Sequence, residues 1–371
     1  MNKTLLAAAV AASAPAWAQQ TQAPAVVVIT GNPLGSGDVA TPSSVLSGNG
    51  LVLRRGSSLG ETLDGLPGVS SSYFGPNANR PVIRGQDGDR IRVLSNAGAS
   101  LDASSLSFDH AVPIDPLVVE RIEVLRGPAA LLYGGSAVGG VVNAIDNRIP
   151  KAPLSGVSGA VETRFGGAAR ERGVSALVEG GGDGFAFHAD AFRRVTDDLR
   201  VPAFERPLED GTRELRSRIV NSASLAHGGA IGAARVWEHG YVGLSLDTYR
   251  NDYGVVAEED VTIQMRRDKL TLAGEMRLTD GFIRTLRAQA ASTDYQHQEI
   301  EGSGAVGTTF ETRGSDARVE AVHRAFGLGS GRVEGTLGMQ LESSRFSALG
   351  EEAFVPSTHT RQAALFVLER W

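Results

Sequence analysis

The stretch that decides the fold is Val118–Ile145, which reads VVERIEVLRGPAALLYGGSAVGGVVNAI. Its first part, Val118–Leu125, alternates β-branched and charged residues after two valines, and this pattern predicts a strand. An Arg-Gly-Pro break follows, because glycine permits unusual backbone angles and proline lacks an N–H donor. The pattern then predicts a short helical turn over Ala129–Tyr133, a glycine-rich loop, and a second apolar strand over Val141–Ile145.

The glycine-rich loop raises the question of phosphate binding. In nucleotide-binding loops the glycines precede a helix, whereas here they follow the helical turn, and no Gly-Lys-Ser/Thr occurs. The alternative is close backbone packing in a small domain with many turns. The order of the elements favours that alternative.

The same stretch resembles the end of the plug domain of TonB-dependent outer-membrane receptors, which carry a similar VERIEVLRGP…LYG…GGVVN run just before their barrel begins. The resemblance implies a mainly β protein with an N-terminal α+β plug domain followed by an antiparallel transmembrane β-barrel. It also implies a receptor in the outer membrane of a Gram-negative bacterium that imports a scarce nutrient with energy supplied through TonB.

The amino-acid composition is compatible with an outer-membrane receptor and argues against several other classes of protein. The net charge of −6 argues against a nucleic-acid partner, and the absence of cysteine excludes disulfides and thiol chemistry. Neither a Gly-x-Ser-x-Gly nor a His-Glu-x-x-His motif occurs, so no enzyme and no prosthetic group is expected. Beyond the N-terminus no apolar run is long enough for a membrane-spanning helix, whereas barrel strands show only alternation.

Residues 1–18 are predicted to be a signal peptide, with a short apolar core and the small-x-small sequence Ala16-Trp17-Ala18. The alternative is an ordinary buried helix, which Pro15 disfavours.

Residues 19–53 are predicted to be a disordered periplasmic tail around one apolar island. An isolated apolar strand needs a partner edge, and this island resembles the TonB box that TonB captures by strand addition. Its residues are Val26, Val27, Val28, Ile29 and Thr30. The alternative is an internal edge strand.

Residues 54–147 are the predicted plug domain. A helix start is indicated by Ser58 three residues before Glu61, and short strands are expected over Arg80–Gln86 and Arg90–Leu94. The acidic turn between those strands lacks the later glutamate of a calcium loop, so a solvated turn is favoured. An irregular loop of the kind that carries ligand contacts follows over Leu101–Pro116.

Residues 148–371 are the predicted partial barrel. Amphipathic segments with a period of two occur over Gly184–Ala191, Tyr241–Tyr249 and Val333–Glu342, as a membrane barrel with a wet lumen requires. A soluble antiparallel sandwich has the same alternation, so the signal peptide and the plug resemblance decide between the two.

The number of strands points to a half barrel. At roughly 20 residues per strand and connection, Pro150–Trp371 supplies about 11 strands, whereas plugged outer-membrane transporters have about 22. We therefore expect the N-terminal half of a receptor. A true C-terminus at Trp371 is the alternative, because aromatic residues do end barrels.

Two places in the sequence carry potential metal ligands. Asp109 and His110 are adjacent in the plug loop, and an imidazole with a carboxylate suits zinc. Further on, counting by twos along one predicted strand puts His297 and Glu299 on its polar face, about 7 Å apart. A hydrogen bond within the loop is the alternative for Asp109 and His110. The other five histidines are taken as structural: His188, His227, His239, His323 and His359.

The plug loop LDASSLSFDHAVPIDPLVVERIEVLRGP resembles that of the outer-membrane zinc-uptake receptors. This resemblance implies Zn²⁺ as the transported ligand, with Asp109 and His110 joined by barrel residues, for which Glu299 and His297 are the candidates. One departure is that Tyr253–Val261 contains no histidine, where those receptors carry a His/Asp-rich loop. The alternatives are a receptor for a siderophore or haem iron and, in other classes, a passive porin or adhesin and a soluble envelope enzyme.

Overall fold

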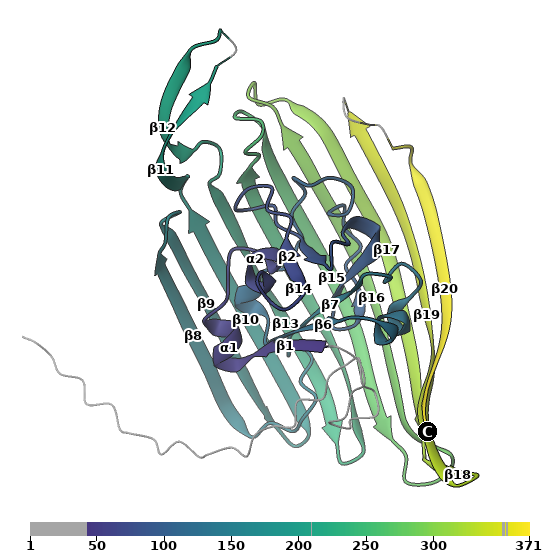
Figure 1. Ribbon diagram of the computed structural model, residues 1–371. Helices are drawn as coiled ribbons and strands as arrows, with labels where there is room; N and C mark the ends of the chain where they lie inside the picture. Colours follow the sequence, from purple (N-terminus) through teal and green to yellow (C-terminus); the bar gives the residue numbers. More distant parts are fainter. Residues whose placement is uncertain (1–42, 209, 351–352, 354) are drawn as a thin grey trace, which may run out of the picture.

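The computed structural model describes residues 43–208, 210–350, 353 and 355–371. The predicted signal peptide and the predicted TonB box, Val26–Thr30, lie outside the described residues. The described chain begins with a small mixed unit of short strands and helices and continues as long antiparallel strands (Figure 1). The predicted fold class, a mainly β protein with an α+β plug before a large antiparallel sheet, is confirmed.

The plug is built on a five-stranded sheet with the order β1-β6-β7-β4-β5, in which only β4 and β7 are parallel. Its strands are β1 (Ser43–Ser47), β4 (Ile91–Ser95), β5 (Gly98–Ala99), β6 (Arg121–Leu125) and β7 (Gly140–Ile145). A hairpin of β2 (Val69–Ser71) and β3 (Pro81–Ile83) lies apart. The helices are α1 (Gly48–Val52) and α2 (Leu59–Leu63), with 3₁₀ turns η1 (Gly88–Arg90), η2 (Pro116–Val118) and η3 (Pro128–Tyr133).

The plug sheet begins before the predicted boundary at residue 54. β1 pairs antiparallel with β6, from Ser43 opposite Leu125 to Ser47 opposite Arg121, and α1 follows it directly. The expectation of a disordered tail over residues 19–53 is therefore wrong for Ser43–Val52. The short sequence SSVLS has little strand pattern of its own, and the free edge of β6 supplies the ladder that orders it.

The decisive stretch folds as strand, turn and strand, with small differences from the prediction. β6 starts at Arg121 rather than Val118, because the Asp115 carboxylate accepts a hydrogen bond from the Leu117 N–H and holds η2. The predicted helical turn is the 3₁₀ helix η3. Gly140 is required where β7 starts: its φ is +146°, and a Cβ there would lie 2.6 Å from the carbonyl oxygen of Leu125.

The long strands form one antiparallel sheet, which we call the wall. Its strands are β8 (Gly156–Gly166), β9 (Glu171–Gly182), β10 (Phe185–Thr196), β13 (Ser224–Trp237), β14 (Gly240–Gly254), β15 (Thr262–Arg277), β16 (Ile283–Ile300), β17 (Val306–His323), β18 (Phe326–Leu328), β19 (Gly331–Gly350) and β20 (Thr358–Arg370). These 11 strands agree with the expected number, although β18 is short. β11 (Leu199–Pro207) and β12 (Arg213–Ile219) form a separate hairpin.

The predicted alternation corresponds to the two faces of the wall. Along β14 the even-numbered Val242, Leu244 and Leu246 are exposed, whereas Ser245 and Asp247 are buried. β10 behaves likewise, with Phe185 and Phe187 exposed and His188 buried, although Phe192 further along is on the buried face. The polar residues therefore face inward and the apolar residues outward, as in a membrane barrel.

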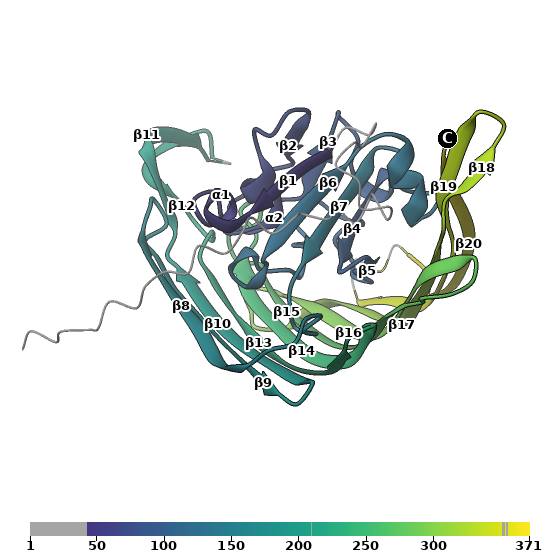
Figure 2. The same cartoon turned by 90° about the horizontal axis from the view of Figure 1, so that it is seen from below.

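The wall is curved and open, and the plug lies against its concave face (Figure 2). Charged contacts join the two units: Arg194 of β10 forms a buried ion pair with Asp115 of the plug, at 2.5 Å. Arg148, at the end of the plug, pairs with Asp190 of β10 at 2.9 Å. Among the described residues, no helix is long and apolar enough to span a membrane.

The two ends of the wall differ in their connections. At one end the turns are tight, with two residues between β9 and β10 and two between β13 and β14. At the other end lie the β11–β12 hairpin and the loop Val255–Val261. We call these the short-turn end and the long-loop end.

Candidate metal centre between plug and wall

The centre lies where the plug loop Ala103–Ala111 meets strands β14 and β16 near the long-loop end. His110 is only 2% exposed. Its Nδ1 lies 3.0 Å from the carbonyl oxygen of Ala103, so the neutral ring carries its hydrogen on Nδ1. That tautomer leaves the Nε2 lone pair directed at the wall, where it can bind a cation.

Burial and neighbouring charge oppose each other at His110. Burial lowers the pKa of His110, but the hydrogen bond with Glu299 and the charges of Asp109 and Glu299 outweigh it, so the pKa stands above its ordinary value. When Nε2 is protonated it can donate to Glu299, whose Oε1 lies 3.4 Å away. A proton here occupies the place that a metal ion would take.

His297 completes the group from β16. It is 0% exposed, its Nδ1 lies 2.7 Å from the hydroxyl of Tyr295, and its Nε2 has no hydrogen-bond partner. The rings of His110 and His297 meet edge to face with centroids 4.3 Å apart, and Phe310 packs against both. A buried imidazole nitrogen without a partner is costly, and a metal ion would satisfy it.

Glu299 is the carboxylate of the centre, two residues beyond His297 on the same buried face of β16. One ligand atom from each of His110, His297 and Glu299 lies within 4.8 Å of the others. A tetrahedral zinc site with bonds near 2.1 Å has ligands about 3.4 Å apart, close to the 3.4 Å between His110 Nε2 and Glu299 Oε1. Two imidazoles and a carboxylate are three zinc ligands, with a fourth position left open.

Asp109 lies beside this group, not within it. Its carboxylate accepts a hydrogen bond from the hydroxyl of Ser107, and it is not among the three clustered residues. Three of the four predicted ligands, His110, His297 and Glu299, thus lie close together. Asp109 instead makes a hydrogen bond within its own loop, which is the alternative to metal binding expected from the sequence. Its charge still acts on the centre, because it helps to raise the pKa of His110.

The loop between β14 and β15 adds negative charge at the mouth of the centre. Burial and the nearby carboxylates of Asp109 and Glu299 raise the pKa of Glu258. Glu259 is instead held by Arg206 and Arg216 of the β11–β12 hairpin. The acidic loop therefore contacts the hairpin on one side and faces the centre on the other.

Sequence reasoning missed the two tyrosines that hold the ligands in place. The Tyr253 hydroxyl donates to the carbonyl oxygen of Asp109 at 2.8 Å and accepts from the Ala111 N–H at 2.9 Å, so it bridges the backbone on both sides of His110. Tyr295 contacts His297. For Tyr295 the sequence did indicate a position near the centre, because it lies two residues before His297 and so on the same face of the strand.

Replacing Tyr253 with phenylalanine should weaken Zn²⁺ binding about 10- to 100-fold, because the Ala111 N–H is left buried without a partner and the loop is no longer tied to the wall. Isothermal titration of the purified protein measures the change. Tyr249→Phe is the matched control, since Tyr249 is a buried tyrosine of the same strand, four residues before Tyr253, and its ring stacks on Phe192. Equal loss in both variants would contradict the bridging role.

The comparisons with known proteins agree with this architecture. Residues 36–141 match the family model of the TonB-dependent Receptor Plug Domain. The fold is similar to the copper transporter OprC, with a TM-score of 0.66 and 15% identity over 84% of this chain and 48% of that one. It is also similar to a mutant of the ferric enterobactin receptor PfeA from Pseudomonas aeruginosa (TM-score 0.67, 16% identity, 89% and 55% covered). The siderophore receptor PirA from Acinetobacter baumannii gives a TM-score of 0.65 at 18% identity, with 88% and 54% covered.

The chain spans about half the length of these solved structures. At such identities the likeness concerns the fold. Residues 36–141 thus match a TonB-dependent receptor plug domain, and the described chain has the fold of the corresponding part of these solved structures.

Proposed function

We propose that this protein is a TonB-dependent outer-membrane receptor that imports zinc, or another divalent metal ion, by energy-coupled active transport. The observation that carries the proposal is the convergence of His110, His297 and Glu299 across the boundary between plug and wall. The metal ion is the cargo of this transport and not a resident cofactor.

Burial of the centre favours an ion over an organic chelate. The three clustered residues are at most 5% exposed, and aromatic rings pack around both imidazoles. A siderophore or a haem needs a cavity of several hundred Å³ lined by groups that match its surface. The mouth is acidic, which attracts cations and repels anionic chelates.

The orientation follows from the connections of the wall. Barrels of the outer membrane have short periplasmic turns and longer extracellular loops. The long-loop end, where β16 carries His297 and Glu299, is therefore assigned to the outside. A metal ion would reach the centre from that side, and the plug would block its further path.

Coupling to TonB would act through the first strand of the plug. β1 follows the tail that carries the predicted TonB box and pairs with β6 over its whole length. Arg126, just after β6, donates to the Ser44 hydroxyl of β1 and to the carbonyl of Pro67. Force on the tail is therefore applied first to the sheet at the centre of the plug, and a metal ion held by His110 would tie that plug to the wall until it moves.

Calorimetric titration of the wild-type protein tests the metal assignment. We expect one Zn²⁺ per chain at pH 7.5, and weaker binding as the pH is lowered. The sign follows from the raised pKa of His110, because Zn²⁺ needs the unprotonated Nε2 and must displace a proton from it. A protein that binds a ferric tris-catecholate chelate but no Zn²⁺, Cu²⁺ or other divalent ion would contradict the proposal and favour the iron-chelate alternative.

A further inference from the structure

The outward face of the wall carries a cross-strand row of basic side chains, three arginines and one histidine. Arg193 of β10 is opposite His227 of β13, which is opposite Arg250 of β14, which in turn is opposite Arg266 of β15. The side chains of all four are on the outward face, because alternate residues of a strand face opposite ways. The adjacent residues in the chain are buried against the plug: Arg194, Ala226, Tyr249 and Arg267. We call these four residues the cationic row. Neighbouring strands are about 4.8 Å apart, so the row is about 14 Å long.

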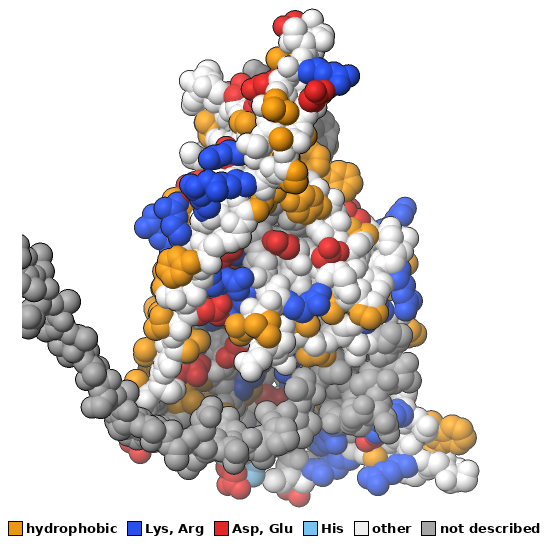
Figure 3. Space-filling model, turned by 60° about the vertical axis from the view of Figure 1, so that its left-hand side comes forward, with side chains coloured by type: hydrophobic (Ala, Val, Ile, Leu, Met, Phe, Trp, Pro, Cys, Tyr) orange, Lys and Arg blue, Asp and Glu red, His pale blue; other side chains and the backbone are white. Residues whose placement is uncertain are grey.

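Nearby charges leave part of this row without partners. Asp268 of β15 pairs with Arg250 at 2.9 Å, and Asp252 of β14 and Asp294 of β16 are further outward carboxylates near the row. In the described part of the chain, neither Arg193 nor Arg266 forms an ion pair. Figure 3 shows Lys and Arg side chains below the β11–β12 hairpin, with hydrophobic side chains beneath them.

Between the row and the short-turn end, the outward face of each of these strands carries apolar side chains. The outward residues there include Phe187 of β10, Ile231 of β13, Leu246 of β14 and Leu270 of β15, all exposed. The step from Arg250 to Leu246 is four residues, or about 13 Å along the strand. The row therefore lies at the upper margin of the apolar belt, at the level where lipid headgroups meet water.

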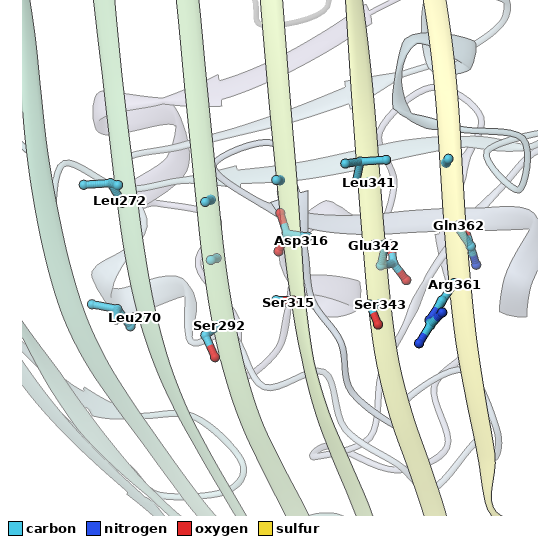
Figure 4. A pocket seen from close by; sticks show the side chains of 14 residues that line it. Leu270, Leu272, Ser292, Ser315, Asp316, Leu341, Glu342, Ser343, Arg361 and Gln362 are labelled. Carbon is cyan, nitrogen blue, oxygen red and sulfur yellow. The ribbon is translucent and has the colours of Figure 1, made fainter.

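The apolar belt is hollowed beneath the row. One hollow of 600 Å³ is bordered by Gly229, Ile231, Leu246 and Leu270, and on the side of the row by Thr248, Asp268 and Asp294. A second hollow of 680 Å³ continues across β15–β20, where Ser292, Ser315 and Ser343 lie between larger leucines (Figure 4). Short side chains between long ones leave furrows along the strands, and such furrows fit acyl chains.

We propose that this face is a docking surface for a phosphorylated lipid of the outer leaflet, with its headgroup phosphates on the cationic row and its acyl chains in the hollows. Guanidinium groups bind phosphate through paired, charge-assisted hydrogen bonds. The length of the row fits a headgroup with two phosphates better than a single one. The proposal rests on the outer-membrane location in the proposed function, but not on the metal as cargo.

The test uses the full chain in zwitterionic detergent, with diphosphorylated lipid A as the probe. Native mass spectrometry and a thermal-shift titration measure lipid binding. At about 1 kcal/mol for each arginine near a headgroup, the double variant Arg193→Gln/Arg266→Gln should bind the lipid about 30-fold more weakly. Binding by the wild type should also weaken as salt is raised.

Arg235→Gln is the matched control. Arg235 is an outward arginine of β13 at the short-turn end, where it packs over Phe185, and its loss should leave lipid binding unchanged. Phosphatidylcholine and inorganic phosphate form two further arms. Weak binding of both supports a phosphorylated lipid, whereas inorganic phosphate that binds as tightly as the lipid would overturn the proposal.

Two further results would overturn it: equal lipid affinity in the double variant and the wild type, or equal loss in the double variant and Arg235→Gln. Zn²⁺ titration of the same variants reports that the fold is intact, because the row lies on the face opposite the metal centre. If no variant binds Zn²⁺ but the lipid result holds, the metal assignment fails and the lipid surface stands.

Discussion

Replacing His110 with alanine should weaken Zn²⁺ binding by more than about 100-fold, since even the outer-shell partners of a metal ligand are worth about 10- to 100-fold. Glu299→Ala should have a comparable effect. The reason is that the centre has three protein ligands, and removing one leaves two, fewer than zinc sites use. Isothermal titration at pH 7.5 measures both variants.

His323→Ala is the matched control for these variants. His323 is also a buried histidine of the wall, with its Nε2 3.0 Å from a carboxylate oxygen of Glu369, but it lies at the short-turn end. Its loss should leave Zn²⁺ affinity unchanged. If His110→Ala and Glu299→Ala bind zinc as tightly as the wild type, the centre is not the binding site, and the iron-chelate alternative moves ahead.

Asp109→Asn should have a much smaller effect than either ligand substitution. In the structure Asp109 acts on the centre through its charge and through the loop, whereas His110, His297 and Glu299 supply the clustered atoms. A loss as large as that of His110→Ala would show that Asp109 turns inward to bind the ion, as the resemblance to zinc-uptake receptors implies.

Replacing Val28 with proline should abolish uptake and leave Zn²⁺ binding intact. Proline removes the N–H that a strand-paired partner must bond and restricts φ, so capture of the predicted TonB box should fail. Radiolabelled zinc uptake in cells that produce the complete receptor measures transport, and titration of the purified protein measures binding. Val28→Ile is the control, because it retains both the N–H and the β-branch.

Normal uptake by the Val28→Pro receptor would mean that Val26–Thr30 is not the segment that TonB captures. The alternative of an internal edge strand makes a different prediction, since proline would then destabilise the fold and lower zinc binding as well. Measuring uptake and binding on the same variants therefore separates the two.

Local patterns in the sequence determined much of the fold. The stretch Val118–Ile145 is sufficient to predict the two central plug strands, and the alternation in Tyr241–Tyr249 predicts which residues face inward, because side chains along a strand point to opposite faces. The same rule placed His297 and Glu299 on one face. The start of the plug was not predictable, because β1 depends on the edge of a strand that comes about 75 residues later.

Only the tertiary structure decided the composition of the metal centre. His110 and Glu299 are 189 residues apart in the chain, and the resemblance, not any local pattern, suggested joining them. Local sequence cannot tell that Asp109 bonds Ser107, or that Tyr253 bridges the backbone around His110, since both depend on how the loop lies against the wall. The cationic row is likewise visible only when Arg193, His227, Arg250 and Arg266 are brought into register by three strand pairings. Secondary structure follows local periodicity, but sites form where distant segments pack, and the packing decides which polar atoms are satisfied and which remain free to bind a ligand.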